Sequence, residues 1–311
     1  MTSLVSVEHL HKQFSNLKAV NDLSFTVNEG DIYGFLGQNG AGKSTTIRML
    51  LTLIKPDSGC IKIFNRDLAA NRAAILRQTG AVIERPDMYK YLSAYDNLSI
   101  FARLSGVSVS RKILMEQLER VGLAGRWNSK VKTFSQGMKQ RLGIAIALVH
   151  DPRLIILDEP TNGLDPQGIA DMRRLITELS SVHGKTVIVS SHLLSEIEMM
   201  ATRMIVIDKG KKIAEGNVNE LLNPSSSIVQ VYTLDNSKSR NIILQSQWAD
   251  CLLPGENMLR FKMDKKDIPL LTAWLSSQGA GIIAVQPRHS LEDYFLSLTA
   301  NPSTHVETVS D

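Results

Sequence analysis

"GFLGQNGAGKSTTIRML", residues 34–50, is the stretch that decides the fold. It holds a complete G-x-x-x-x-G-K-S pattern between an apolar strand expected over 32–36 and a helix expected over 43–53. In such a loop, backbone N–H groups turn inward around a phosphate and the helix dipole adds to the attraction. The predicted phosphate-binding residues are Gly37, Gln38, Asn39, Gly40, Ala41, Gly42, Lys43, Ser44 and Thr45.

Two of these residues carry specific chemistry. Lys43 supplies a positive charge for the β- and γ-phosphates, and the Ser44 hydroxyl is a ligand for Mg²⁺. An ordinary glycine turn would not need a lysine and a serine in this register. The stretch therefore predicts a P-loop NTPase of the α/β class.

A second motif, "RLIILDEPTNGLD" at residues 153–165, supplies carboxylates. Its apolar strand ends in Asp158 and Glu159, at the edge where open α/β sheets bind ligands. We expect Asp158 to hold Mg²⁺ and Glu159 to orient or deprotonate the attacking water. An acidic cap on a buried strand is the plainer alternative, and the upstream phosphate loop favours the functional one.

The pattern along the chain predicts several parts. Strands and turns fill residues 4–36, helical periodicity dominates 85–150, and buried strands then alternate with amphipathic helices, which indicates a mainly parallel sheet. We expect an ATPase domain over 1–222 with an antiparallel β subdomain and a helical subdomain at about 85–150. A turn-rich linker over 223–227, a small α+β domain over 228–300, including a helix at 291–298, and a disordered tail over 301–311 complete the prediction.

Composition narrows the classes of function. The chain has 311 residues, a net charge of +4 and no dense run of Lys and Arg, so we expect no nucleic-acid partner. Its two cysteines indicate no disulfide framework, and the N-terminus does not resemble a secretion signal. No apolar stretch reaches the roughly 18 residues needed to span a bilayer. If the protein works at a membrane, other subunits must cross it.

The order of four further motifs resembles the nucleotide-binding subunit of ATP-binding cassette (ABC) transporters, from about residue 5 to 220. Phe14 resembles the aromatic residue that stacks on adenine. "FSQGM" at 134–138 resembles the signature loop, "NGLD" at 162–165 the loop after the catalytic carboxylate, and "SSH" at 190–192 the switch histidine. The resemblance implies ATP and Mg²⁺, and catalytic roles for Lys43, Glu159 and His192.

The same resemblance implies that ATP is bound between two subunits, a homodimer or a heterodimer with a paralogue. Ser135 and Gly137 of one subunit would face the phosphate loop of the other. Residues 135–137 lie where a helix is capped, and apolar residues then recur at Met138, Leu142, Ala145 and Val149. A helix start with a hydroxyl and a glycine is suited to an anion.

Two positions depart from the family pattern. Gln136 replaces the first glycine of the signature loop, and it either crowds the partner's nucleotide or points into solvent; we favour tolerance. Glu84 stands where the family carries a lid glutamine, after a strand expected over 79–83. It is either a nucleotide and Mg²⁺ ligand or only a hinge residue, and both remain open.

Several single residues have competing interpretations. Phe14 is an adenine platform or an ordinary hydrophobe. His192 is the only histidine placed at a strand end near the phosphate residues, and the histidines show no metal-ligand spacing. Asp165 caps a helix near Gly168 and, in the family, also contacts the opposite subunit. Tyr89, Tyr91 and Tyr95 are either core residues or anchors for a membrane subunit, and the basic turn 209–212 is expected to be solvated.

The resulting hypothesis is an ATPase subunit that powers an exporter through a separate membrane-spanning permease, peripheral on the cytoplasmic face of the membrane. The C-terminal "LEDYFLSL", Glu84 and Gln136 resemble exporters of the bacitracin-resistance and lantibiotic self-protection type, and the cargo stays unidentified. One alternative is a soluble ABC-type ATPase in macromolecular assembly, which commonly has two cassettes or a long insertion. Another is a P-loop kinase, which would have no use for the Ser135 loop or His192.

Overall fold

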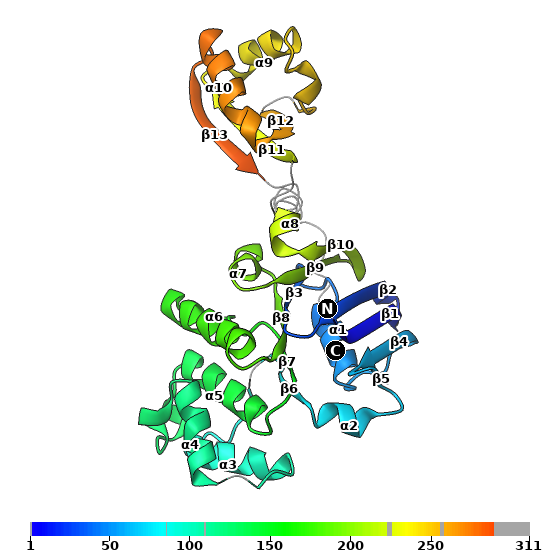
Figure 1. The fold of residues 1–311 in the computed structure, drawn as a ribbon, viewed down its shortest axis with the longest axis vertical. Coiled ribbons are helices and arrows are strands. Elements are labelled where there is room, and N and C mark those ends of the chain that lie inside the picture. Colours follow the sequence, from blue (N-terminus) through cyan, green and yellow to red (C-terminus); the bar gives the residue numbers. More distant parts are fainter. Residues whose placement is uncertain (1, 85, 109, 223–225, 256–257, 289–311) are drawn as a thin grey trace. The chain divides into compact units, whose positions relative to one another are not determined.

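The computed structural model describes residues 2–84, 86–108, 110–222, 226–255 and 258–288, and the chain divides into two compact units, 1–217 and 218–311 (Figure 1). The division lies five residues before the end that the sequence indicated for the ATPase domain. Strand β11 (Ser226–Thr233) also begins inside the expected linker, because Ser226 and Ser227 pair with Asp264 and Met263. The expected helix at 291–298 and the tail at 301–311 lie outside the described residues.

A six-stranded sheet forms the centre of the first unit, in the order β10-β9-β3-β8-β7-β6. Strands β6 to β9 and β3 are parallel to their neighbours, and β10 pairs antiparallel with β9. Every residue of β3, β7 and β8 is buried, as expected for parallel strands covered on both faces. The strands are β3 (Ile32–Leu36), β6 (Thr79–Val82), β7 (Leu154–Leu157), β8 (Thr186–Ser191), β9 (Arg203–Asp208) and β10 (Lys211–Asn217).

Helices cover this sheet on opposite faces (Figure 1). Helix α1 (Lys43–Leu50) lies on one face, and α6 (Pro166–Ser181) lies on the other. The short helix α7 (Leu194–Glu198) contacts β3 and β8. The helices bury apolar side chains against the strands, including Ile47, Leu175, Ile176 and Ile197.

A second, antiparallel sheet in the order β2-β1-β4-β5 packs against the outer side of α1. Its strands are β1 (Ser3–Phe14), β2 (Leu17–Asn28), β4 (Ser58–Ile63) and β5 (Arg66–Asp67). Inward-facing residues such as Val5, Leu23 and Phe25 share one hydrophobic core with Ile47 and Phe35. This shared core fixes the phosphate loop between the two sheets.

The helical part of the unit holds three longer helices and two short ones: α3 (Ala94–Leu104), α4 (Arg111–Arg120), η1 (Ala124–Arg126), η2 (Val131–Thr133) and α5 (Gln136–Leu148). The short helix α2 (Arg72–Leu76) lies outside this group and contacts β6. Serine side chains cap α3, α4 and α5, and each accepts a hydrogen bond from the backbone N–H of the residue three positions later. The Ser110 hydroxyl, for example, accepts from the N–H of Ile113 at the start of α4. Helix α5 approaches the segment after β6 closely, because a Cβ at Gly143 would lie 2.6 Å from Cγ of Pro86.

The second unit has α8 (Val218–Leu222) followed by a three-stranded antiparallel sheet in the order β12-β11-β13. The remaining elements are α9 (Asn236–Leu244), η3 (Ala249–Cys251), β12 (Leu259–Asp264), η4 (Lys265–Asp267), α10 (Ile268–Ser277) and β13 (Ile282–Arg288). Its own core contains Val229, Phe261, Ile243 and Leu275. The described part of this unit is thus an α+β fold with a separate core.

Candidate functional site

The phosphate loop runs from the end of β3 to the start of α1, and glycine is required at two of its positions. Gly42 has a φ of +107°, and a Cβ there would lie 2.4 Å from the backbone oxygen of Ala19. A Cβ at Gly37 would lie 2.6 Å from the backbone oxygen of Ile207. Because backbone atoms pack against both positions, a residue with a side chain would not fit at either Gly37 or Gly42.

Lys43 begins α1 and its side chain is only 5% exposed. Its Nζ donates hydrogen bonds to the backbone oxygens of Gly37 at 2.7 Å and Gln38 at 3.3 Å. The same Nζ lies 3.1 Å from Oε1 of Glu159, an ion-pair contact without hydrogen-bond geometry. A buried ammonium group is thus held at the loop, close to a carboxylate from another strand.

Asp158 and Glu159 follow β7 directly, and Ser190 at the end of β8 holds both. The Ser190 hydroxyl donates to Oδ1 of Asp158 at 2.6 Å and accepts from the backbone N–H of Glu159 at 2.9 Å. Glu159 has a φ of +48°, a strained conformation for a residue with a side chain. Ser190 of β8 therefore holds the carboxylate of Asp158 and the backbone of Glu159 at the end of β7.

His192 follows β8, and its Nδ1 lies 2.8 Å from Oε2 of Glu159. The Glu159 side chain, which is 16% exposed, therefore contacts both Lys43 of α1 and the histidine that follows β8. Three residues that the sequence assigned to catalysis, Lys43, Glu159 and His192, are brought into direct contact. No described group of three or more His, Cys, Asp and Glu side chains is arranged as a metal site.

A pocket of about 630 Å³ opens beside these residues. It is lined by Ser44, Ile83, Glu84, Gln136, Gln140, Asp158, Glu159, Asn162 and Gly163. Oδ2 of Asp158 is buried and has no hydrogen-bond partner among the described residues. Ser44 and Asp158 line the same pocket, and a hydroxyl oxygen and a carboxylate oxygen are the kind of donors that a hard cation such as Mg²⁺ prefers.

Glu84 lines this pocket but pairs outward. Its carboxylate forms an ion pair with Arg48 of α1, and its side chain is 62% exposed. Its φ of +54° places the residue in the left-handed region, at the point where the chain leaves β6. In this conformation the Glu84 carboxylate is therefore paired with Arg48.

Other predicted site residues lie apart from this pocket. Phe14 is 43% exposed at the end of β1, with Nζ of Lys12 5.3 Å from its ring centroid. Ser135 is exposed and accepts from the N–H of Met138 at 3.3 Å, as the cap of α5. A Cβ at Gly137 would meet no atom nearer than Cδ2 of Leu164 at 3.8 Å. Gln136, by contrast, lines the pocket.

The aromatic residues of the segment 89–95 divide into two groups. Tyr89 and Tyr91 are exposed, whereas Tyr95 is half-buried and packs edge-on against Trp127 at 6.1 Å between ring centroids. Asp165 caps α6, and its carboxylate accepts from the N–H of Gly168 at 3.1 Å. The capping role that the sequence indicated for Asp165 is thus confirmed.

Sequence reasoning gave no role to two residues of the site. Ser190 stands within the "SSH" motif, and its position on the strand beside the carboxylates was the signal that could have identified it. Gln140 is 3% exposed and lines the pocket, one helical turn after Gln136. The period of α5 could have placed these two glutamines on one face.

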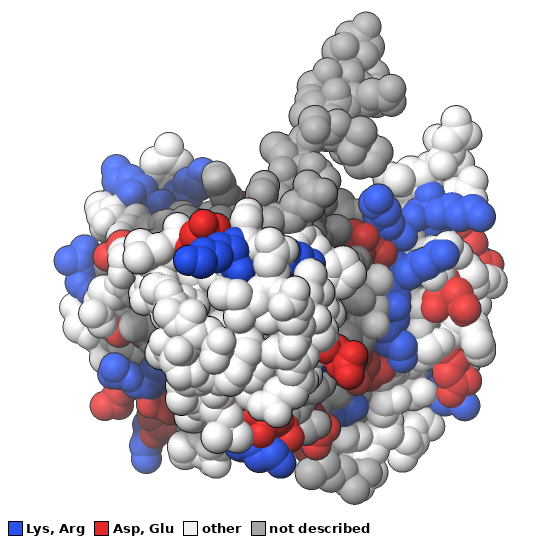
Figure 2. Space-filling model, turned by 90° about the horizontal axis from the view of Figure 1, so that it is seen from above, with Lys and Arg blue, Asp and Glu red and all other residues white. Residues whose placement is uncertain are grey.

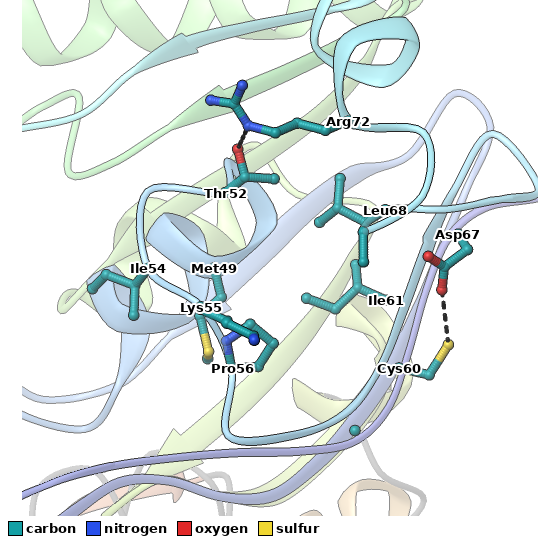
Figure 3. Close-up of a pocket in the computed structure, with 12 residues that line it drawn as sticks. Met49, Thr52, Ile54, Lys55, Pro56, Cys60, Ile61, Asp67, Leu68 and Arg72 are labelled. Carbon is teal, nitrogen blue, oxygen red and sulfur yellow. Dashed lines mark hydrogen bonds between the residues drawn. The ribbon is translucent and has the colours of Figure 1, made fainter.

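A second cavity, of about 310 Å³, lies away from these residues (Figure 3). Its floor is apolar, with Met49, Ile61 and Leu68, and two polar contacts lie at its rim. Arg72 donates to Thr52 at 2.6 Å, and Sγ of Cys60 lies 3.9 Å from Oδ2 of Asp67 (Figure 3). None of the predicted site residues lines this cavity.

Lys and Arg side chains are interspersed with Asp and Glu side chains on the face drawn in Figure 2. The helices in the described part of the chain include none that is long and apolar enough to cross a bilayer.

Comparison with known proteins gives the family. A family model described as "ABC transporter" matches residues 20–162. The bacitracin transport ATP-binding protein BcrA of Bacillus licheniformis is 40% identical over 302 residues, which cover 96% of this chain and 98% of BcrA. The chain belongs to the ABC transporter family of ATP-binding proteins.

Two further members show how far the ABC likeness extends. The lantibiotic transport ATP-binding protein SrtF of Streptococcus pyogenes is 41% identical over 226 residues, covering 71% of this chain and 96% of SrtF. The ATP-binding cassette MJ0796, solved as a dimer in a post-hydrolysis state with ADP and Pi, matches with a TM-score of 0.62 at 26% identity. It covers 69% of this chain and 98% of that one. The chain is therefore an ABC ATP-binding subunit with the α/β P-loop fold, and its reaction is the hydrolysis of ATP.

Proposed function

We propose that this ABC subunit hydrolyses ATP to drive export through a separate membrane-spanning permease, as a peripheral protein on the cytoplasmic face. The observation that carries the proposal is the contact of one carboxylate, Glu159, with both Lys43 and His192. Relatives named for bacitracin and lantibiotic transport support a peptide antibiotic, a drug or a lipid-like compound as cargo. These names do not favour the alternative of a macromolecular assembly factor.

Each residue of the site has a defined task in this proposal. The loop amides at 37–45 and Lys43 bind the β- and γ-phosphates, and Phe14 stacks on the adenine. Glu159 accepts the proton of the attacking water, while His192 holds that carboxylate in position and contacts the γ-phosphate. The contact of Lys43 with the Gly37 and Gln38 oxygens shows that its ammonium group already lies at the loop.

Ser44 and Asp158 would hold Mg²⁺, with Glu84 joining only after release from Arg48. The cation would neutralise phosphate charge as the bond to the γ-phosphate breaks. The free Oδ2 of Asp158 supports this assignment, because a buried carboxylate oxygen without a partner is costly. Ser190 keeps that oxygen available by occupying Oδ1.

Dimerisation completes the site in this proposal. Ser135 and Gly137 are exposed or open in one chain, so they are available to the nucleotide of a second chain, identical or paralogous. A helix start with a serine hydroxyl and free N–H groups binds an anion. Exposed Tyr89 and Tyr91 suit the permease contact, whereas half-buried Tyr95 suits the core. No nucleic acid is needed.

The test is to purify the chain together with the polytopic membrane protein encoded beside it and to measure ATPase activity with candidate peptides, drugs and lipids. We expect activity to rise with one class of compound, and to be absent in a matched complex that carries Glu159→Gln. The transport proposal would be overturned if the chain did not associate with membranes and if neither the permease nor any candidate compound changed its ATPase activity.

A further inference from the structure

Glu196 is a buried carboxylate that no part of the proposed reaction uses. It lies in α7 and is 6% exposed. One of its oxygens, Oε2, accepts hydrogen bonds from two hydroxyl groups, those of Thr161 and Ser191, each at 2.7 Å. Both partners are buried as well. Burial of a carboxyl group costs free energy that an apolar side chain would not, so a purpose beyond packing is indicated.

The two hydroxyl groups belong to the two segments that carry the reaction. Thr161 lies two residues after Glu159, where the loop of residues 161–165 begins. Ser191 directly precedes His192, and its Oγ also accepts from the backbone N–H of Leu193 at 3.0 Å. Glu196 therefore ties the chain just beyond Glu159 to the chain on both sides of His192.

Helix α7 is itself fixed to the centre of the sheet. The neighbouring residue, Ile197, is fully buried, and a Cβ at Gly34 in β3 would lie 2.4 Å from its Cγ2. The helix approaches the strand this closely only because residue 34 has no side chain. Since β3 also leads into the phosphate loop, Glu196 is held in a fixed relation to that loop.

We propose that Glu196 is a positioning residue for ATP hydrolysis. It holds Thr161 and Ser191 so that Glu159 and His192 keep their 2.8 Å contact, and it touches neither nucleotide nor metal. The inference rests on the roles proposed for Glu159 and His192. Loss of the tie lets the two segments separate, and the hydrolytic step slows while the phosphate loop keeps its shape.

The test compares three variants of the full chain with its permease. Glu196→Ala removes both hydrogen bonds, Glu196→Gln keeps a carbonyl oxygen that accepts them, and Glu198→Ala removes an exposed carboxylate from the same helix as a control. We expect Glu196→Ala to lower kcat by roughly 10- to 100-fold, the scale of a misplaced catalytic group. ATP affinity should stay close to that of the unsubstituted protein, and Glu196→Gln and Glu198→Ala should retain kcat.

If Glu196→Ala does not fold, Thr161→Val and Ser191→Ala test the same tie from the other side. Each should lower kcat, and the double variant should lose less than the product of the two single losses, because both remove one shared arrangement. An unchanged kcat in all of these variants, or a loss of ATP affinity that equals the loss of kcat, overturns the inference.

Glu159→Gln separates this inference from the proposed function. If Glu159→Gln abolishes turnover and Glu196→Ala does not affect it, only the positioning role of Glu196 fails. If Glu159→Gln turns over ATP normally, the proposed catalytic assignment itself fails.

Discussion

The Nδ1 atom of His192 lies 2.8 Å from Oε2 of Glu159, although 32 residues separate the two positions in the chain. Parallel pairing of β7 with β8 places both at the same edge of the sheet. The other oxygen of the carboxylate lies 3.1 Å from Nζ of Lys43. One side chain thus links the phosphate loop with His192, and its chemistry can be tested directly.

Glu159→Gln should bind ATP and fail to hydrolyse it, because the amide cannot accept a proton from water. We expect kcat to fall by roughly 100- to 10,000-fold, the contribution of general acid–base catalysis. Dimers should accumulate in ATP, as measured by light scattering after gel filtration. Normal hydrolysis by this variant would remove Glu159 from the catalytic role.

Lys43→Ala should lose ATP binding, since the phosphate charge loses its buried counter-ion. Hydrogen bonds to charged groups contribute about 1.5–3 kcal/mol each, so affinity should fall on the order of 100-fold. Titration calorimetry with ATP measures the loss. Lys55→Ala, an exposed lysine of the second cavity, is the matched control and should bind normally. Tight ATP binding by Lys43→Ala would contradict the assignment of the phosphate loop.

Ser135→Asp should prevent ATP-dependent dimerisation without unfolding α5. Aspartate is as good a helix cap as serine, so thermal stability should be retained, whereas its charge repels a phosphate. Mixed dimers of a Ser135→Asp chain with a Lys43→Ala chain contain one intact composite site. Recovery of part of the ATPase activity on mixing is expected, and no recovery at any ratio would speak against a site shared between subunits.

Gly137→Ala and Gly143→Ala, both in α5, should affect different properties: the first dimerisation and the second stability. A Cβ at Gly143 would lie 2.6 Å from Cγ of Pro86, so this substitution should lower the free energy of unfolding by about 1–3 kcal/mol. A Cβ at Gly137 has room in its own chain, so stability should be unchanged while ATP-dependent dimerisation falls. Urea unfolding and gel filtration separate the two effects. Full dimerisation of Gly137→Ala would show that residue 137 does not approach the partner's nucleotide.

The free energy of unfolding should fall in mild acid because of His150. Burial lowers the pKa of His150 below its ordinary value of 6.5, and its Nδ1 has no described hydrogen-bond partner. Below pH 6.5 the unfolded chain therefore binds a proton at His150 more readily than the folded chain does. The contribution of neutral, buried His150 to the free energy of unfolding is present above pH 6.5 and is lost as the pH falls below that value. His150→Asn should reduce the slope in urea unfolding between pH 7 and about 5. An unchanged slope would assign the acid sensitivity to other groups.

Much of the fold followed from patterns of adjacent residues. The P-loop from Gly37 to Ser44 predicted the fold class, and the apolar runs predicted strands such as β7 and β8. The cap at Asp165 was also predicted from spacing alone. These features are local, because glycine content, side-chain period and capping act within a few residues. The start of β11 at Ser226 was not predicted, since a serine-rich turn segment becomes a strand only through its pairing with β12.

The sequence alone thus determined the family pattern, the phosphate loop and the identities of Asp158, Glu159 and His192 as candidates. Only the tertiary structure decided that the Ser190 hydroxyl contacts both the Asp158 carboxylate and the Glu159 backbone, that Arg48 pairs with Glu84, and that Glu196 ties two loops together. The physical reason is that these contacts join residues between 5 and 36 positions apart, whose approach depends on strand order and helix packing. No local spacing encodes which side chains meet when separate strands end at one edge of a sheet.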